Sequence, residues 1–114
     1  MKRGLKGFSR AIRDGQVDDA EERLESIVQG NMKKEKWKGY HWALRGMVEA
    51  LDSDIDLSLP RQISEGKMDV EKMEKLRDEM EKRASQEFRP GYERGYNSAW
   101  SDVLQVIIED ADED

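Results

Sequence analysis

The strongest hydrophobic pattern in the chain runs over residues 33–51. Large apolar side chains recur there every three or four residues, the spacing that places them on one face of an α-helix. They are Trp37, Tyr40, Leu44, Met47 and Leu51. Small residues form a second line beside them: Gly39, Ala43, Gly46 and Ala50. A bulky line next to a small line predicts a central helix with neighbours on two sides, one of them packed almost backbone to backbone.

Two shorter helices are predicted before it, one over residues 4–14 and one from Asp18 or Asp19 to a stop at Gly30, with Gly15 in the turn between them. We expect Asp18 or Asp19 to cap the second of these helices and Asn31 to cap the central one. A connection of about three residues forces the first two helices to lie antiparallel. Their expected buried residues are Leu5, Phe8, Ala11 and Ile12, then Ala20, Leu24, Ile27 and Val28.

Two more helices are predicted after residue 67, one beginning near Asp69 and one running from Tyr92 to about Glu109. Residues 52–67 form a connection whose apolar side chains suggest that it packs on the other helices, with a helical turn around Leu59–Ile63. The expected apolar stripe of the first of these helices is Val70, Met73, Leu76, Met80, Ala84 and Phe88. For the last helix we expect a buried line of Tyr96, Ala99, Val103 and Ile107.

The last helix also has a line of small residues, Gly91, Gly95 and Ala99. We expect this line to pack against the Gly39 line of the central helix. The predicted fold class is all-α: a compact bundle of four to five helices in one domain over residues 1–110. Residues 110–114 should form an acidic frayed tail.

The amino-acid composition limits the classes of protein to which this chain can belong. The 114 residues are 40% charged and 36% hydrophobic, which suits a thin helical bundle with solvated outer faces. The chain has no cysteine, which excludes a disulfide scaffold and thiolate metal sites. Its basic start lacks the apolar core of a signal peptide, and no run reaches membrane-spanning length. We therefore expect a soluble, cytoplasmic protein with no membrane partner.

Charge is distributed unevenly around the net value of −6. Residues 1–45 hold eleven Lys/Arg against seven Asp/Glu, whereas residues 46–114 hold nine against nineteen. Such asymmetry is typical of a polar interaction surface or of head-to-tail self-association. The same asymmetry also arises without any function, from the positions of charged helix ends and an acidic tail along the chain.

The stretch AIRDGQVDDAEERLESI resembles the centre of a tetratricopeptide unit, with Gly15 in the turn and Ala20 small enough for close helix packing. Leu24 and Ile27 follow at the spacing of that unit. The resemblance covers residues 5–28 and occurs once. It implies a TPR-like antiparallel hairpin at the start of the bundle, rather than a peptide-binding array of several units.

Carboxylates provide one candidate for chemistry. Glu21, Glu22 and Glu25 are followed on the next helix by Glu49 and Asp52. This E-E-x-x-E and E-x-x-D spacing is similar to the magnesium site of the MazG-like all-α nucleotide pyrophosphatases. The resemblance implies an Mg²⁺-dependent nucleotide hydrolase, since Mg²⁺ takes hard oxygen ligands and completes its shell with substrate phosphates. The other interpretation is two solvated helix faces and no cofactor. The two sets need not meet within one chain, although they could meet across a dimer.

The second candidate is the basic, aromatic segment over residues 33–45. Cations interleaved with aromatic rings suit phosphate attraction and base stacking, which makes weak nucleic-acid binding one hypothesis. Trp42 shares a helix face with Lys38 and Arg45, and His41 lies beside it. An exposed tryptophan among charges is typical of a protein-contact hot spot. Alternatively, Trp42 is covered by the connection 52–67.

Our leading interpretation is a small non-enzymatic interaction protein, an adaptor or regulator. It would bind a protein partner, or a second copy of itself, through Trp42, Lys38, Arg45 and His41, or through the concave side of the first three helices. The metal-dependent hydrolase and the nucleic-acid binder are the alternatives.

Overall fold

The computed structural model describes residues 4–53 and 58–112, which form six α-helices and, within those ranges, no strand. The helices are α1 (Leu5–Arg13), α2 (Val17–Glu25), α3 (Lys34–Asp52), α4 (Leu59–Ser64), α5 (Val70–Ser85) and α6 (Gly91–Asp112). The predicted all-α bundle is confirmed. The short α4 is the helical turn predicted within the connection, whose residues 54–57 lie outside the described ranges. The expected packing of Ile55 and Leu57 falls there as well.

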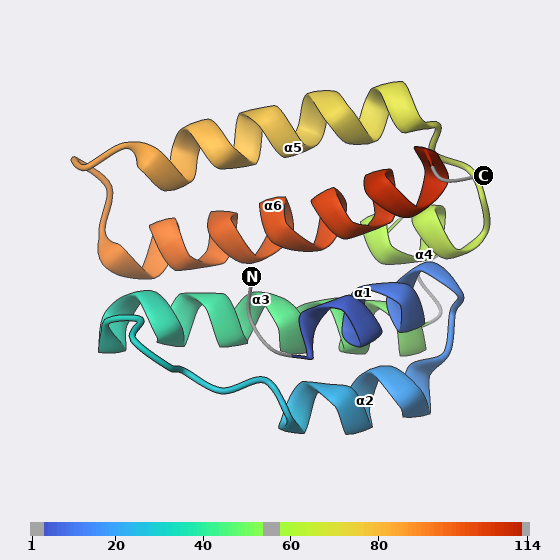
Figure 1. Cartoon of the computed structure of the whole chain (residues 1–114), viewed down its shortest axis with the longest axis horizontal. Coiled ribbons are helices and arrows are strands. Elements are labelled where there is room, and N and C mark those ends of the chain that lie inside the picture. The colour runs from blue at the N-terminus through green and yellow to red at the C-terminus, as the bar shows by residue number, and fades with distance from the viewer. Residues whose placement is uncertain (1–3, 54–57, 113–114) are drawn as a thin grey trace.

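The long helices α3 and α6 lie side by side and run in the same direction (Figure 1). Helix α5 packs antiparallel on α6, on the side opposite α3 (Figure 1). Helices α1 and α2 form an antiparallel pair, and both contact α3 (Figure 1). The core lies where α1, α3 and α6 meet. Its largest fully buried side chains include Leu5, Phe8, Ile12, Tyr40, Leu44, Met47, Val103 and Leu104.

Two glycines let α3 and α6 approach backbone to backbone. A Cβ on Gly39 would lie 1.9 Å from the carbonyl oxygen of Tyr92, and one on Gly95 would lie 1.8 Å from that of Lys36. Both obstacles are backbone atoms, so any side chain at either position would force the two helices apart. The predicted contact between the two small-residue lines therefore exists, with Ala43 and Ala99 fully buried beside the glycines.

Gly46 does not belong to this contact, contrary to the prediction. It is exposed, and a Cβ there would have nothing within 4 Å. Packed helices cross at an angle, so their backbones come closest near one crossing point, which here lies around Gly39 and Gly95. Gly46 lies two turns beyond Gly39 and faces solvent.

A partly buried hydrogen bond also joins α3 and α6. The Tyr40 hydroxyl donates to Asp102 Oδ2 at 2.8 Å. Burial raises the pKa of both groups, and the neighbouring carboxylate adds to the effect on the phenol. The phenol is therefore the donor at neutral pH, and it satisfies part of the hydrogen-bonding capacity of a half-buried carboxylate.

Two of the predicted caps are wrong. Helix α2 begins at Val17, directly after Gln16, whose N–H bonds the Ala11 carbonyl, so the turn at Gly15 closes sooner than expected. Helix α3 begins after Lys33 rather than Asn31. The predicted start of a helix near Asp69 is confirmed: Asp69 caps α5, and its side chain accepts the Lys72 N–H at 2.8 Å.

Three side chains expected in the core are exposed instead: Val28 (61%), Phe88 (80%) and Tyr96 (37%). Helices α2 and α5 end at Glu25 and Ser85, so Val28 and Phe88 lie in connections and not on the helix faces. Tyr96 lies next to the close approach at Gly95, where the gap between helices is too narrow for a bulky ring. Helix α6 itself continues past Glu109 to Asp112, and residues 113–114 of the predicted tail lie outside the described ranges.

Candidate functional site

One line of α3 faces solvent along the whole helix. Its members follow one another at alternating intervals of three and four residues: Glu35, Lys38, Trp42, Arg45, Glu49 and Asp52. We call this line the α3 outer face. Exposed Gly46 lies beside it, whereas the opposite side of the helix holds the core residues Tyr40, Leu44 and Met47.

Trp42 sits at the middle of this face and is 59% exposed. The predicted alternative, burial beneath the connection 52–67, is therefore wrong. Trp42 lines a shallow groove of ≈ 430 Å³ together with Lys38, His41 and Arg45, so the structure brings together all four residues predicted to bind a partner. The same groove is lined by Trp37 and Tyr92.

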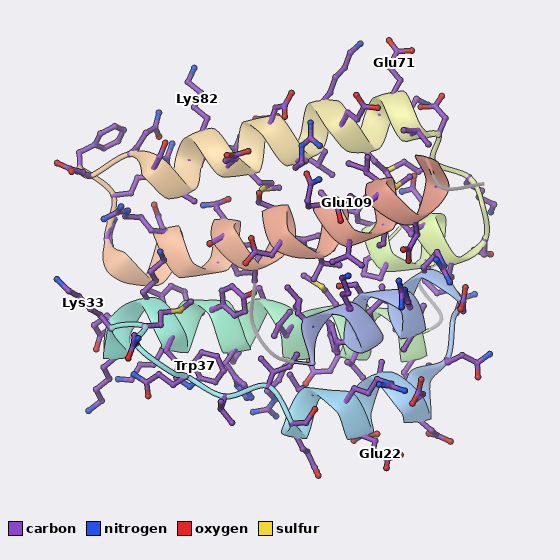
Figure 2. All side chains as sticks on the ribbon, in the orientation of Figure 1. Glu22, Lys33, Trp37, Glu71, Lys82 and Glu109 are labelled. Atoms are coloured by element: carbon purple, nitrogen blue, oxygen red, sulfur yellow. The ribbon has the colours of Figure 1, made fainter. Side chains whose placement is uncertain are left out.

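Trp37 and Tyr92 were missed because the sequence pattern assigned them other places. Trp37 is only half-buried and projects from α3 on the side away from α6 (Figure 2). Its ring stacks on Tyr40 at a centroid distance of 6.1 Å and lies 5.4 Å from the His41 ring. The spacing of four between Trp37 and His41 was a usable signal, because residues so spaced are neighbours on a helix surface. Tyr92 lies in the first turn of α6. Its backbone lies against Gly39 of α3, and this contact places Tyr92 at the edge of the groove.

The groove carries positive charge. Lys38 makes one exposed ion pair with Glu35, with Nζ 3.4 Å from Oε1, a contact of the kind that contributes little in water. Arg45 has no carboxylate partner among the described residues. Burial, and then the charge of Arg45, lower the pKa of His41, so its imidazole is neutral at pH 7. The groove thus offers two cations, exposed aromatic surface and one neutral hydrogen-bonding ring.

The carboxylates of the predicted magnesium site do not converge. Glu21, Glu22 and Glu25 are exposed on α2, and Glu22 points away from the other helices (Figure 2). Glu49 and Asp52 are exposed on the α3 outer face. Across residues 4–53 and 58–112, no group of three or more His, Asp or Glu side chains is placed to hold a metal ion. Within one chain these residues are solvated helix faces.

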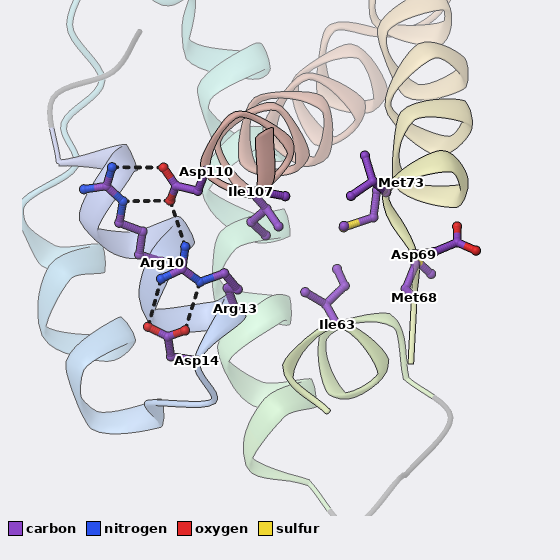
Figure 3. A pocket seen from close by; sticks show the side chains of 11 residues that line it. Arg10, Arg13, Asp14, Ile63, Met68, Asp69, Met73, Ile107 and Asp110 are labelled. Atoms are coloured by element: carbon purple, nitrogen blue, oxygen red, sulfur yellow. Dashed lines mark hydrogen bonds and ion pairs between the residues drawn. The ribbon is translucent and has the colours of Figure 1, made fainter. Parts of the chain in front are cut away.

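A second, larger groove of ≈ 730 Å³ lies where α1, α4, α5 and α6 meet (Figure 3). Its apolar wall includes Ile63, Met73 and Ile107, and charged residues form the rim. Asp110 accepts hydrogen bonds from Arg10 Nε at 2.8 Å and Arg13 Nη1 at 2.9 Å (Figure 3).

Arg13 also donates to Asp14. Both guanidinium groups are engaged by carboxylates of the chain itself, and the pKa of Asp110 is lowered, first by its hydrogen bonds from Arg10. These ion pairs join α1 to α6. Because both arginines already bind carboxylates of the chain, they are poorly placed to bind an anionic ligand.

Comparison with protein-family models, curated proteins and solved structures finds no match to this chain. The tetratricopeptide and pyrophosphatase resemblances therefore rest on the residues quoted for them. Among the described helices, none has the length and apolar character needed to cross a lipid bilayer.

Proposed function

We propose that this chain is a small non-enzymatic protein-interaction domain that binds its partner through the groove around Trp42. The observation that carries the proposal is a large aromatic side chain, 59% exposed, at the centre of a well-packed helix. Tryptophan supplies much apolar contact area with few rotatable bonds, which is why it is enriched at the centres of protein interfaces.

The surroundings of Trp42 favour a partner that presents both apolar surface and negative charge. Lys38 and Arg45 flank the ring and would steer acidic groups towards it. Trp37 and Tyr92 extend the aromatic surface of the groove. Because α3 is anchored on α6 through Gly39 and Gly95, the groove is presented on a rigid element, which limits the entropy lost on binding.

Site-specific photo-crosslinking in cells tests this proposal. One chain carries p-benzoylphenylalanine in place of Trp42, and a matched control carries it in place of Phe88. Phe88 is a suitable control because it is an aromatic residue, is 80% exposed and has a cation close by, with Arg89 5.4 Å from its ring centroid. We expect discrete protein adducts from position 42 and not from position 88, and we expect them to disappear when Lys38 and Arg45 are both replaced by Glu. Identical adduct patterns from the two positions would refute the proposal.

A further inference from the structure

The order of charges along the α3 outer face suits one particular partner. From the beginning of the helix the signs run negative at Glu35, positive at Lys38, then Trp42, positive at Arg45, and negative at Glu49 and Asp52. A three-and-four spacing is common to every exposed helix line. A central tryptophan flanked by two cations, with carboxylates beyond them on both sides, is not.

We propose that the partner of this face is a second copy of the same chain, docked with the two α3 helices antiparallel about a twofold axis between Ala43 and Leu44. In that arrangement Lys38 of each copy faces Glu49 of the other, which gives two opposite-charge pairs. Trp42 of each copy faces Arg45 of the other, which gives two cation–π contacts. The inference rests on the proposed function, because it names the partner of the same groove.

The charge order also selects the direction of the two helices. A parallel pair in register would set Lys38 against Lys38 and Glu49 against Glu49, and like charges placed together are strongly unfavourable. Only the antiparallel pair matches opposite signs at the centre. A twofold arrangement of this kind is also closed, so it yields a dimer and not a filament.

Gly46 provides room for the second helix. It is exposed, nothing lies within 4 Å of a Cβ placed there, and the antiparallel register sets it opposite His41 of the other copy. A glycine at that level leaves space for the Trp42 ring to lie flat across the interface. At the ends of the interface Glu35 meets Asp52, and exposed Lys34 lies next to Glu35 to offset that like-charge contact.

A single helix face is a small interface, so we expect the dimer to be weak, with a Kd on the order of micromolar. Analytical ultracentrifugation of the purified chain over a series of concentrations measures it directly. The wild type should sediment as twice its 13.3 kDa mass at high concentration. Lys38→Glu and Glu49→Lys should each raise the Kd roughly tenfold or more, since each turns both central pairs into like-charge contacts.

The decisive sample is a 1:1 mixture of the K38E chain and the E49K chain. In the mixed dimer every 38–49 pair again has opposite signs, so the mixture should associate although neither variant does so alone. Lys75→Glu is the matched control, because Lys75 pairs with Glu71 on α5 and both are almost fully exposed, at 78% and 79%. It makes the same charge change away from the face and should leave the Kd unchanged.

A wild type that stays monomeric at millimolar concentration, or a mixture that fails to associate, would overturn the inference. So would a dimer that the K38E substitution does not weaken. Photo-crosslinks from position 42 to a different protein, together with a monomeric wild type, would leave the proposed function standing and remove only the second copy as partner. Circular dichroism of each variant confirms that the helices are intact.

Discussion

Replacing Gly95 by alanine should destabilise the protein, although alanine is normally more favourable than glycine inside a helix. A Cβ at this position would lie 1.8 Å from the Lys36 carbonyl oxygen and 2.9 Å from the Tyr40 nitrogen. Both obstacles are backbone atoms of α3, so no side chain can rotate away. Ordinary contact begins near 3.4 Å, so α3 and α6 would have to separate locally by about 1.6 Å.

The cost of that separation outweighs the gain from alanine. Overpacking of this kind costs about 1–3 kcal/mol and occasionally more, because a gap of even 1 Å forfeits up to half of the dispersion energy of the facing atoms. Alanine in a helix interior gains about 0.5–1 kcal/mol over glycine. With a rigid obstacle on the other side, we expect Gly95→Ala to lower the free energy of unfolding by about 2 kcal/mol. The melting temperature should fall by about 8 °C.

Gly46→Ala is the matched control, since it makes the same chemical change in a helix interior with nothing within 4 Å. It should raise the free energy of unfolding by about 0.5–1 kcal/mol. Urea unfolding followed by circular dichroism measures both variants, at a protein concentration low enough for the chain to be monomeric. If Gly95→Ala proved as stable as the wild type, the backbone contact between α3 and α6 would be wrong.

Two further outcomes follow from the charged groups. Asp110→Asn should lower the free energy of unfolding by about 1–2 kcal/mol at pH 7, because it weakens charge-assisted hydrogen bonds from Arg10 and Arg13. The folded-state pKa of Asp110 lies below 3.8, so its stabilisation is present above that pH and is lost as the pH falls through the folded-state value. The difference from wild type in urea unfolding should therefore be smaller at pH 3 than at pH 7, and an equal difference would contradict the assignment. The pKa of His41, measured by NMR titration of the only histidine, should lie below 6.5 and rise in Arg45→Gln while staying below 6.5, because burial is the larger cause and persists. A value unchanged by that substitution would show that Arg45 does not act on the ring.

Periodicity predicted most of the fold because the spacing of apolar and small residues within the longest helices shows which face of each helix is buried. The line of Tyr40, Leu44 and Met47 and the glycines at 39 and 95 predicted both α3 and the helix against which it packs. The failures occurred at the ends of helices, which apolar spacing does not define. Gln16 closing onto Ala11 moved the start of α2, and the early ends of α2 and α5 left Val28 and Phe88 outside the core.

The candidate site was predictable in part for a related reason. Helical spacing alone places Lys38, Trp42 and Arg45 on one face, so sequence reasoning could find them. It could not decide whether a distant segment covers Trp42, and it could not see Tyr92, which reaches the groove from another helix. Gly46 shows the same limit: its place on the small-residue line follows from spacing, but spacing does not show where along α3 the contact with α6 ends.

The pairing of α3 with α6 has a consequence for how the protein folds during its synthesis on the ribosome. Helix α3 finds its glycine contact and the hydroxyl acceptor of Tyr40 only in residues 91–112, the last helix of the described chain to be synthesised. Until that segment emerges, the apolar face of α3 lacks its most extensive helix contact, and contacts between distant segments are slow to form. The domain therefore cannot fold cooperatively until residues 91–112 have emerged, and α3 stays without its main packing partner until then.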